Sequence, residues 1–410
     1  MRTLAGWLEY IERQHPQPIA MGLERVAQVH AAMKVPFACP VITVGGTNGK
    51  GSTCAMLEAI LQAAGYRTGL YSSPHLIRYN ERVRVAGVEL DDAALAESFE
   101  AVEAARGSIP LTYFEFGTLA AFYLFSRERI EALVLEVGLG GRLDAVNLID
   151  ADCAVLTSVG IDHIEFLGST REAIGREKAG IFRAGRPAVV ADPDPPATVL
   201  DTGARLLRID RDFGYVNQGS QWSWWGPSGK RGGLAHPALR GATQLRNASA
   251  AIAALDALRE RLPVAMQDVR RGLAEVTLPG RFQVLPGRPQ VILDVAHNPQ
   301  AASVLAANLA DAGFSPQVIA VLGMLKDKDM AGVVRAVAPR VTRWHLASLP
   351  GARGASAAEL GRVLAQEKID APRMEHAGVA EALAAARSEA DENDKIVVFG
   401  SFLTVAGAYG

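Results

Sequence analysis

Residues 41–53, VITVGGTNGKGST, join an apolar run to a glycine-rich turn that carries one lysine. The apolar part predicts a buried strand, and the pattern after the turn predicts a helix from Gly51 to Ala64. A glycine turn between a strand and a helix lets main-chain N–H groups converge on an anion, to which Lys50 adds a positive charge. The stretch therefore predicts a nucleotide phosphate site, formed by Gly49, Lys50, Gly51 and Ser52.

The spacing of this turn differs from the usual Walker A pattern. Lys50 is followed by Gly51, so the first hydroxyl comes one position later, at Ser52. A tight turn that only packs a helix against a sheet is the alternative interpretation. The lysine favours the phosphate site, because a packing turn has no need of a charge.

Composition limits the class of protein. The chain has 410 residues, 49% of them hydrophobic, and a formal net charge of −2, which predicts a large core and two domains. The charges give no broad cationic face, so neither nucleic acid nor a membrane is expected as a partner. The longest apolar run is too short to cross a bilayer. Cys39, Cys54 and Cys153 lack metal-ligand spacing, so we expect a cytoplasmic protein without structural zinc.

Short apolar runs alternate with helical patterns through the first half of the chain. This order predicts a doubly wound α/β core with a mainly parallel sheet. The runs are VITV, TGLYSS, LVLEV, CAVLTSV and PAVVA. Between residues 206 and 239 the pattern changes to glycines and alternating aromatics, which predicts a β-hairpin insertion. Trp222, Trp224 and Trp225 beside Lys230 and Arg231 could imitate a nucleic-acid surface, but we interpret them as hairpin packing.

Two Pro-Gly turns in TLPGRFQVLPGRPQ mark a domain boundary. We expect residues 1–284 to form a central domain that contains the phosphate loop. Residues 285–410 are expected to form a smaller, Rossmann-like α/β domain, whose predicted strands are VILDVA, VIAVLG, RWHLAS and KIVVFGS.

Polar residues close several predicted strands, where ligands of open parallel sheets bind. Glu136 lies inside the apolar run LVLEV, where a carboxylate is costly unless it is paired or binds a cation. His163 follows Asp162 at the end of another predicted strand, and Ser72, Ser73 and His75 follow a third. These residue types predict a magnesium site. The alternatives are an ion pair for Glu136, a packing role for His163 and an ordinary Ser-Pro turn.

A series of ordered motifs carries a family resemblance. The motifs are GGTNGKGST, YSSPHLIRYNERVRVAG, LTYFEFGTLAAF, LEVGLGGRLDAVN, GIDHIEFLG, REKAGIF, LPGRFQV, LDVAHNPQAA, LGMLKDKD and FGSFLTVA. Together they resemble the folylpolyglutamate synthases, of the bifunctional dihydrofolate synthase type, within the Mur ligase superfamily. The resemblance runs from Trp7 to Ala406.

The resemblance implies an ATP and magnesium site. It assigns ATP to Gly49, Lys50, Gly51, Ser52, Asn247, Arg281 and Asp294, and places the nucleotide between the domains. It assigns magnesium, as two ions, to Ser73, Glu136 and His163, with a carbamylated Lys178. From the residues alone, Lys178 is interpreted as a solvated helix lysine. Asn247 could equally be the N-cap of the helix that follows, and this role can coexist with ATP binding.

The resemblance also implies the substrates. Thr112, Tyr113, Phe114, Glu115, Leu143, Asp144 and Ala145 match the pteroate-binding segments, with Phe114 offering a flat face to the pterin ring. His297 and Asn298 are our candidates for positioning glutamate, the alternative being a strand-to-helix turn with Asn-Pro punctuation. Ala20 departs from the family, which carries an aspartate there. The expected substrates are dihydropteroate, tetrahydrofolate and L-glutamate, and we expect a monomer.

The implied reaction activates a carboxylate with ATP. Its γ-phosphoryl group converts the pteroate or folate carboxylate into an acyl phosphate, which the amine of glutamate then attacks. A P-loop switch or kinase is one alternative, but the chain has no Asn-Lys-x-Asp motif. A cell-wall Mur ligase is the other, and TYFEFGTLA and SSPHL favour the folate branch. Folylpolyglutamate synthesis without the dihydropteroate reaction also stays open.

Overall fold

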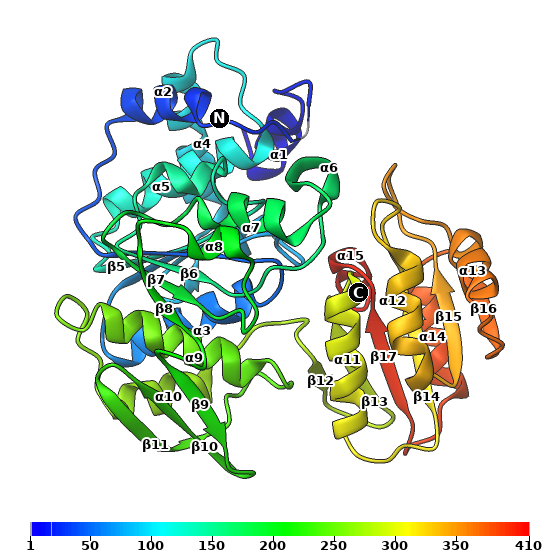
Figure 1. The fold of residues 1–410 in the computed structure, drawn as a ribbon. Helices are drawn as coiled ribbons and strands as arrows, with labels where there is room; N and C mark the ends of the chain where they lie inside the picture. Colours follow the sequence, from blue (N-terminus) through cyan, green and yellow to red (C-terminus); the bar gives the residue numbers. More distant parts are fainter. Residues whose placement is uncertain (1, 18, 410) are drawn as a thin grey trace. The chain divides into compact units, whose positions relative to one another are not determined.

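The computed structural model describes residues 2–17 and 19–409, which pack into two compact units. The first contains the chain up to Ala238 together with Leu245–Val276, and the second contains Leu239–Gln244 and the chain from Thr277 onward (Figure 1). The division after Val276 precedes the predicted boundary at 284/285. The reason is that strand β12 (Gln283–Leu285) pairs with β13 (Gln290–Asp294) in the sheet of the second unit.

The first unit is built on an eight-stranded sheet of order β4-β3-β2-β5-β1-β6-β7-β8. Its strands are β1 (Val41–Gly45), β2 (Thr68–Tyr71), β3 (Val83–Val85), β4 (Val88–Glu89), β5 (Ala132–Glu136), β6 (Cys153–Leu156), β7 (Pro187–Val190) and β8 (Arg205–Arg208). The neighbouring strands β2, β5, β1, β6, β7 and β8, in this order across the sheet, are all paired in parallel, as the sequence predicts. The short strands β3 and β4 add an antiparallel edge that the sequence analysis missed.

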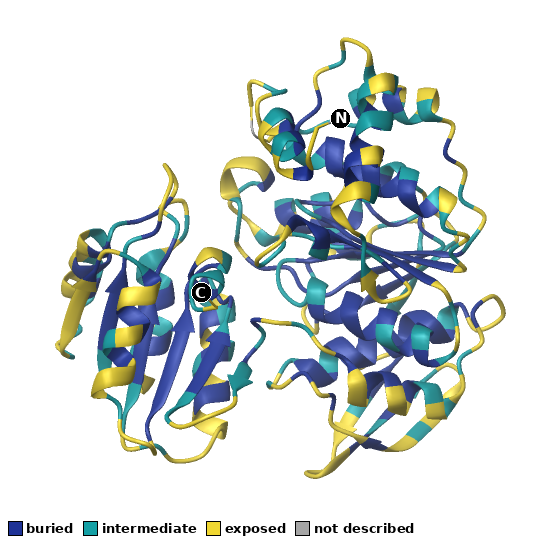
Figure 2. Cartoon of the chain, turned by 180° about the vertical axis from the view of Figure 1, so that it is seen from behind, coloured by how far each residue is buried: buried dark blue, intermediate teal, exposed yellow. Residues whose placement is uncertain are grey.

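Helices cover both faces of this sheet (Figure 1). They are α1 (Leu4–Glu12), α2 (Glu24–Met33), α3 (Lys50–Ala63), α4 (Asp92–Arg106), α5 (Tyr113–Arg127), α6 (Ile164–Leu167), α7 (Arg171–Ala179), α8 (Ala197–Leu200), α9 (Gln244–Ala257) and α10 (Met266–Glu275), with the 3₁₀ turns η1 (Tyr79–Arg82) and η2 (Ala145–Leu148). Figure 2 shows their buried sides turned toward the sheet and their exposed sides turned outward. In the described part of the chain, none of the helices combines the length and apolar character that a membrane span requires.

The predicted hairpin insertion is a three-stranded antiparallel sheet. It consists of β9 (Gly214–Asn217), β10 (Gln221–Gly226) and β11 (Gly229–Ala235) in the order β11-β10-β9, one strand more than a hairpin. Trp222 and Trp224 are fully buried, and their indole N–H groups donate to the carbonyls of Ala235 (2.9 Å) and Ser249 (3.2 Å). These tryptophans therefore serve packing, as predicted.

The second unit contains a six-stranded sheet of order β12-β13-β17-β14-β15-β16. Besides β12 and β13, its strands are β14 (Val318–Leu322), β15 (Arg343–Ala347), β16 (Arg373–His376) and β17 (Lys395–Phe399). Its helices are α11 (Pro299–Asp311), α12 (Met330–Val337), α13 (Ala357–Gln366), α14 (Val379–Glu389) and α15 (Phe402–Ala406), with the 3₁₀ turn η3 (Ala338–Arg340). All strand pairs except β12·β13 are parallel, which confirms the predicted α/β class.

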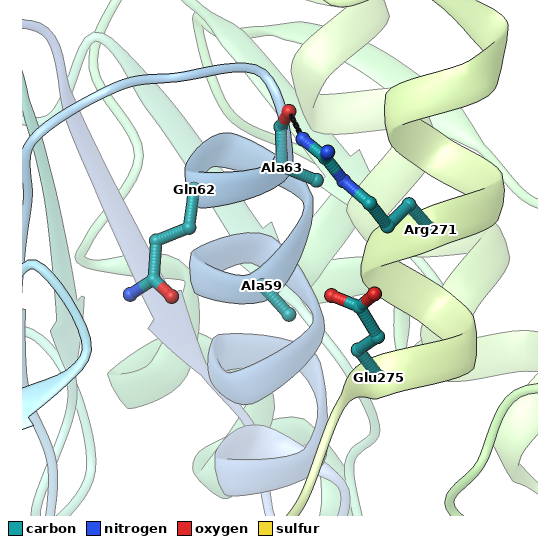
Figure 3. Close-up of a pocket in the computed structure, with 5 residues that line it drawn as sticks. All are labelled: Ala59, Gln62, Ala63, Arg271 and Glu275. Carbon is teal, nitrogen blue, oxygen red and sulfur yellow. Dashed lines mark hydrogen bonds between the residues drawn. The ribbon is translucent and has the colours of Figure 1, made fainter.

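Helices α3 and α10 approach each other closely through a glycine. A Cβ atom on Gly272 would lie 2.5 Å from the Cα atom of Ile60 and 2.6 Å from its nitrogen, so only glycine fits there. Beside this contact, Arg271 donates to the carbonyl of Ala63 at the end of α3 (Figure 3). The pocket in Figure 3 has a volume of about 340 Å³ and is lined by Ala59, Gln62, Ala63, Arg271 and Glu275, so it contains no predicted site residue.

The Gly272 contact makes a stability prediction. Gly272→Ala should lower the free energy of unfolding of the first unit, because overpacking costs about 1–3 kcal/mol. The gain in helix propensity, about 1 kcal/mol, offsets only part of this cost, since the clash involves backbone atoms that cannot rotate away. Urea unfolding followed by circular dichroism measures the change. Gly232→Ala, where nothing lies within 4 Å of the Cβ position, is the matched control; equal midpoints for both variants would refute the argument.

Candidate active site

The loop from β1 to α3 has the geometry of an anion site. The ammonium group of Lys50 donates to the carbonyls of Gly46 (3.1 Å) and Thr47 (3.3 Å), so the lysine folds back over the loop. Gly49 precedes the helix with φ 89°, and a Cβ atom on Gly46 would lie 1.9 Å from Thr157 Oγ1. Both positions therefore need glycine. The first N–H groups of α3 follow directly, as phosphate binding at a helix N-terminus requires.

Residues after β6 hold this loop in place. The main-chain N–H of Asn48 donates to Ser158 Oγ (3.0 Å), and Thr157 Oγ1 donates to the carbonyl of Asn48 (2.7 Å). Asn247 of α9 also packs against this loop. Its Oδ1 atom lies 2.7 Å from the point where a Cβ atom on Gly49 would be. The alternative role of Asn247 as an N-cap is wrong, since α9 begins earlier, at Gln244. The structure thus brings Asn247 to the loop.

Glu136 and Ser73 meet at the carboxyl edge of the sheet. Glu136 is buried at the last position of β5, opposite Val44 of β1, and its Oε2 atom accepts the N–H of Ser73 at 3.2 Å. His163 is not at a strand end as expected, because β6 stops at Leu156 and the histidine lies in the loop that follows. It precedes α6 with φ 52°, and Asp162 Oδ1 accepts its main-chain N–H at 2.9 Å.

Lys178 is buried, which excludes the alternative of a solvated helix lysine. It lies near the end of α7 and only 5% of it is exposed. Burial, together with the positive charge of Lys50, lowers the pKa of Lys178 to about 7, while Asp162 and Asp144 oppose the shift. A large fraction of this amine is therefore neutral near pH 7, and the residue lies within electrostatic reach of the phosphate loop.

The oxygen donors at this edge fit a hard divalent cation. A carboxylate, a serine hydroxyl and carbonyl groups are ligands that magnesium accepts. Within residues 2–17 and 19–409, no three His, Cys, Asp or Glu side chains gather in a way that could hold a metal ion. A site built on Glu136 and Ser73 consequently needs a further anionic oxygen from another residue type, or from the ligand.

The segment Thr112–Glu115 starts helix α5 through a capping box. Glu115 N–H donates to Thr112 Oγ1 (3.2 Å), and Thr112 N–H donates to Glu115 Oε2 (2.8 Å). The other oxygen of this buried carboxylate accepts from Arg25 at 2.8 Å, and Arg25 also donates to the carbonyl of Ala20 at 3.1 Å. Both oxygens of Glu115 thus already have protein partners.

Phe114 and the turn before η2 lie together. The ring of Phe114 covers Gly138, where a Cβ atom would lie 2.7 Å from Cζ, and its centroid is 5.8 Å from that of Tyr71. Asp144 closes the turn by accepting the N–H groups of Leu139 (2.8 Å) and Val146 (3.0 Å). Burial raises the pKa of Asp144 to about 6, although these hydrogen bonds oppose it. Of its neighbours in the sequence, Leu143 is half-buried and Ala145 is buried.

A second group of predicted residues lies in the second unit, after β13. Asp294 accepts the N–H groups of Phe282 (2.9 Å) and Ala296 (2.8 Å), and burial raises its pKa. The guanidinium of Arg281 lies 5.1 Å from the ring centroid of Phe402, and the ring of His297 lies 6.3 Å from it. Asn298 caps α11 by accepting the N–H of Ala301 at 2.9 Å, so the strand-to-helix turn weighed for this motif is present.

Arg82, which is not among the residues predicted from the sequence, lines a pocket of about 430 Å³ in the first unit. The pocket is lined by Leu8, Glu9, Glu12, His15, Gln17, His75, Arg82 and Tyr113. The Nε atom of Arg82 donates to His75 Nδ1 at 2.8 Å. Burial lowers the pKa of His75 to about 4, and the charge of Arg82 adds to the effect. The signal in the sequence was the arginine-rich segment RYNERVR, which gave no indication of which arginine is buried.

Comparisons with known proteins agree with this geometry. Residues 44–255 match the Mur ligase middle domain, and residues 280–402 match the Mur ligase glutamate ligase domain. The chain is 47% identical over 415 residues to the dihydrofolate synthase/folylpolyglutamate synthase of Escherichia coli (strain K12), covering 98% of this chain and 94% of that protein.

Solved structures share the whole fold. E. coli FolC in complex with DHPP and ADP superimposes with a TM-score of 0.94 at 46% identity, over 99% of this chain and 96% of that one. A bifunctional folylpolyglutamate synthase/dihydrofolate synthase with Mn, AMPPNP and L-glutamate bound gives a TM-score of 0.91 at 46% identity, over 99% and 97%. This chain belongs to the dihydrofolate synthase/folylpolyglutamate synthase family of Mur ligases, which are ATP-dependent ligases.

Proposed function

We propose that this chain joins L-glutamate to dihydropteroate and to folate glutamates in a reaction driven by ATP. The observation that carries the proposal is the loop from β1 to α3, where Lys50 and a helix N-terminus follow the strand that pairs, at Val44, with the strand-end residue Glu136. A lysine over a glycine loop holds phosphate, and a carboxylate at the same edge suits the cation that accompanies ATP. We infer the folate substrates from the family to which the chain belongs.

The reaction converts the acceptor carboxylate, whose oxygen is a poor leaving group, into an acyl phosphate, whose phosphate is a good one. The acceptor carboxylate attacks the γ-phosphorus of ATP, ADP leaves, and an acyl phosphate forms. The amine of glutamate then attacks the acyl carbon, loses a proton and expels inorganic phosphate. Lys50 stabilises the charge that develops on the transferred group, so its contribution is electrostatic rather than covalent.

We assign the divalent cation, Mg²⁺ in this proposal and two ions in all, to Ser73, Glu136, His163 and Lys178. Such an ion neutralises phosphate charge and orients the transferred group. The burial of Glu136 against the N–H of Ser73 supports this set. An ammonium at Lys178 would repel the cation, whereas a carbamate supplies an anionic oxygen. Carbon dioxide adds only to a neutral amine, and the lowered pKa of Lys178 provides one.

The substrate assignments follow the predicted segments. We place the pterin ring against Phe114, with Thr112, Tyr113, Glu115, Leu143, Asp144 and Ala145 around it. We assign further ATP contacts to Asn247, Arg281 and Asp294, and L-glutamate to His297 and Asn298. In this proposal residues 1–284 bind ATP and pteroate, residues 285–410 act as the glutamate-ligase domain, and the protein works as a cytoplasmic monomer.

Product analysis tests the function. Purified enzyme with ATP, Mg²⁺ and L-glutamate should convert dihydropteroate to dihydrofolate and should lengthen tetrahydrofolate by glutamate, both detected by mass spectrometry. Lys50→Ala should lower both rates by about 100-fold or more, because it removes charge stabilisation without affecting the core. Lys230→Ala, on the exposed end of β11, is the control. Use of a nucleotide-linked peptide in place of either pterin would point instead to a cell-wall ligase.

Glu136→Gln should raise the Mg²⁺ concentration needed for half-maximal rate by about tenfold or more, because an amide binds a hard cation less strongly than a carboxylate. His163→Ala should act in the same direction. A magnesium titration of the initial rate measures both, with Glu260→Gln, an exposed carboxylate on the same unit, as the control. If both site variants keep the wild-type titration curve, the metal assignment is wrong.

Lys178 should carry a carbamate in the active enzyme. Enzyme equilibrated with ¹³C-bicarbonate should show a carbamate resonance by NMR that Lys178→Ala lacks. Occupancy at fixed carbon dioxide should rise as pH increases through about 7, since the neutral amine becomes available above the pKa of Lys178. Lys178→Ala should lose most activity, and added short carboxylates should restore part of it. Full activity in Lys178→Ala would refute the assignment.

A further inference from the structure

Arg82 is a buried cation whose protein partners are all neutral. Only 9% of the residue is exposed, and it lies at the end of η1. Its guanidinium lies 5.3 Å from the ring centroid of Tyr79 and 5.5 Å from that of Tyr113, and its Nε atom donates to His75. In the part of the chain that the structure describes, Arg82 forms no ion pair with an Asp or Glu side chain.

The neighbouring phenols do not supply the missing negative charge. Burial raises the pKa of Tyr113 to about 12, and it raises the pKa of Tyr79 as well, with Arg82 opposing the shift in both cases. Both hydroxyl groups therefore stay protonated near pH 7. A buried charge without a counter-charge is unfavourable in proteins, which favours an anion from outside the chain.

The other arginines of this segment show that the missing counter-charge is specific to Arg82. Arg78 pairs with Glu89 at 2.7 Å, and Arg84 pairs with Glu58. Each lies within four positions of Arg82 in the sequence. Arg82 instead lines the 430 Å³ pocket, where its Nε atom donates to His75 and its guanidinium lies near the rings of Tyr79 and Tyr113.

The position of the pocket indicates which molecule supplies the anion. The carbonyl of Arg82 accepts the N–H of Ser72 at 2.9 Å, next to the proposed metal ligand Ser73. Tyr113 precedes Phe114, where we place the pterin. The pocket therefore adjoins both the proposed metal site and the proposed pterin site. Glu9 and Glu12 also line it, so the pocket is not uniformly cationic and suits a single carboxylate group better than a nucleotide polyphosphate.

We propose that this pocket binds the α-carboxylate of the terminal glutamate of a folate acceptor, with Arg82 as its partner. The inference rests on the proposed function. Tetrahydrofolate presents this α-carboxylate beside the γ-carboxylate that reacts, whereas the only carboxylate of dihydropteroate is the reacting one. Arg82 then acts as a specificity residue for the extension reaction, and a guanidinium suits a carboxylate because it donates two parallel hydrogen bonds.

The experiment compares both acceptors in Arg82→Gln. KM for tetrahydrofolate should rise about tenfold or more, as expected for loss of a charge-assisted hydrogen bond. kcat/KM for dihydropteroate should stay within about twofold of wild type. Arg82→Lys should recover part of the tetrahydrofolate KM. Arg78→Gln, an exposed arginine of the same segment, is the control, and thermal unfolding of each variant monitors the fold.

A second measurement removes the charge from the ligand instead of the protein. Calorimetric binding of tetrahydrofolate to the wild-type enzyme should be about tenfold or more tighter than binding of its α-carboxamide analogue, and Arg82→Gln should bind the two alike. This arm needs neither turnover nor a fully stable variant. Equal wild-type affinity for both compounds, or equal loss for both acceptors in Arg82→Gln, overturns the proposal. Failure of the proposed function gives a different result, namely that wild type ligates neither acceptor.

Discussion

The carboxyl edge of the sheet in the first unit holds two lysines, Lys50 and the buried Lys178, whose positive charges repel each other. Lys50 is held over the phosphate loop by two carbonyl groups, and its charge helps to lower the pKa of the buried Lys178. Asp144 and Asp162 oppose that shift from the loops that follow β5 and β6. The edge therefore concentrates positive charge where phosphate has to bind, and keeps one amine largely neutral instead of adding a second cation.

Several predicted binding residues also hold the backbone together. Thr112 and Glu115 close the first turn of α5, Asp144 closes the turn before η2, and Asn298 starts α11. A side chain that satisfies main-chain N–H groups is fixed in direction, which is what a binding group needs. Substitution of these residues changes local folding and ligand contact together. Kinetic effects at these positions consequently need a separate measure of stability before they are assigned to binding.

The sequence predicts the parts of the fold that have strong local signals. The run from Val41 and the glycine loop specify β1 and α3 to within one residue, and Glu136 stands at a strand end because its neighbours are apolar. Local patterns could not reveal that β6 stops at Leu156, since the β-branched residues Thr157 and Val159 that follow also favour a strand. Nor could they reveal that Lys178 and Arg82 are buried, because burial of a charged residue depends on which distant segments pack over it. The short edge strands β3 and β4 contain too few residues for an alternating pattern of hydrophobic and polar residues to be recognised.

The small sheet formed by β9, β10 and β11 contacts helix α9, which carries Asn247 next to the phosphate loop. The indole of Trp224 donates to the carbonyl of Ser249, two positions beyond Asn247, and Arg231 pairs with Asp256 on the same helix at 3.8 Å. Asn247 in turn lies against Gly49. A shorter relative that lacked this sheet would leave the outer side of α9 without its aromatic cover. The insertion thus supports the helix that brings Asn247 to the phosphate loop.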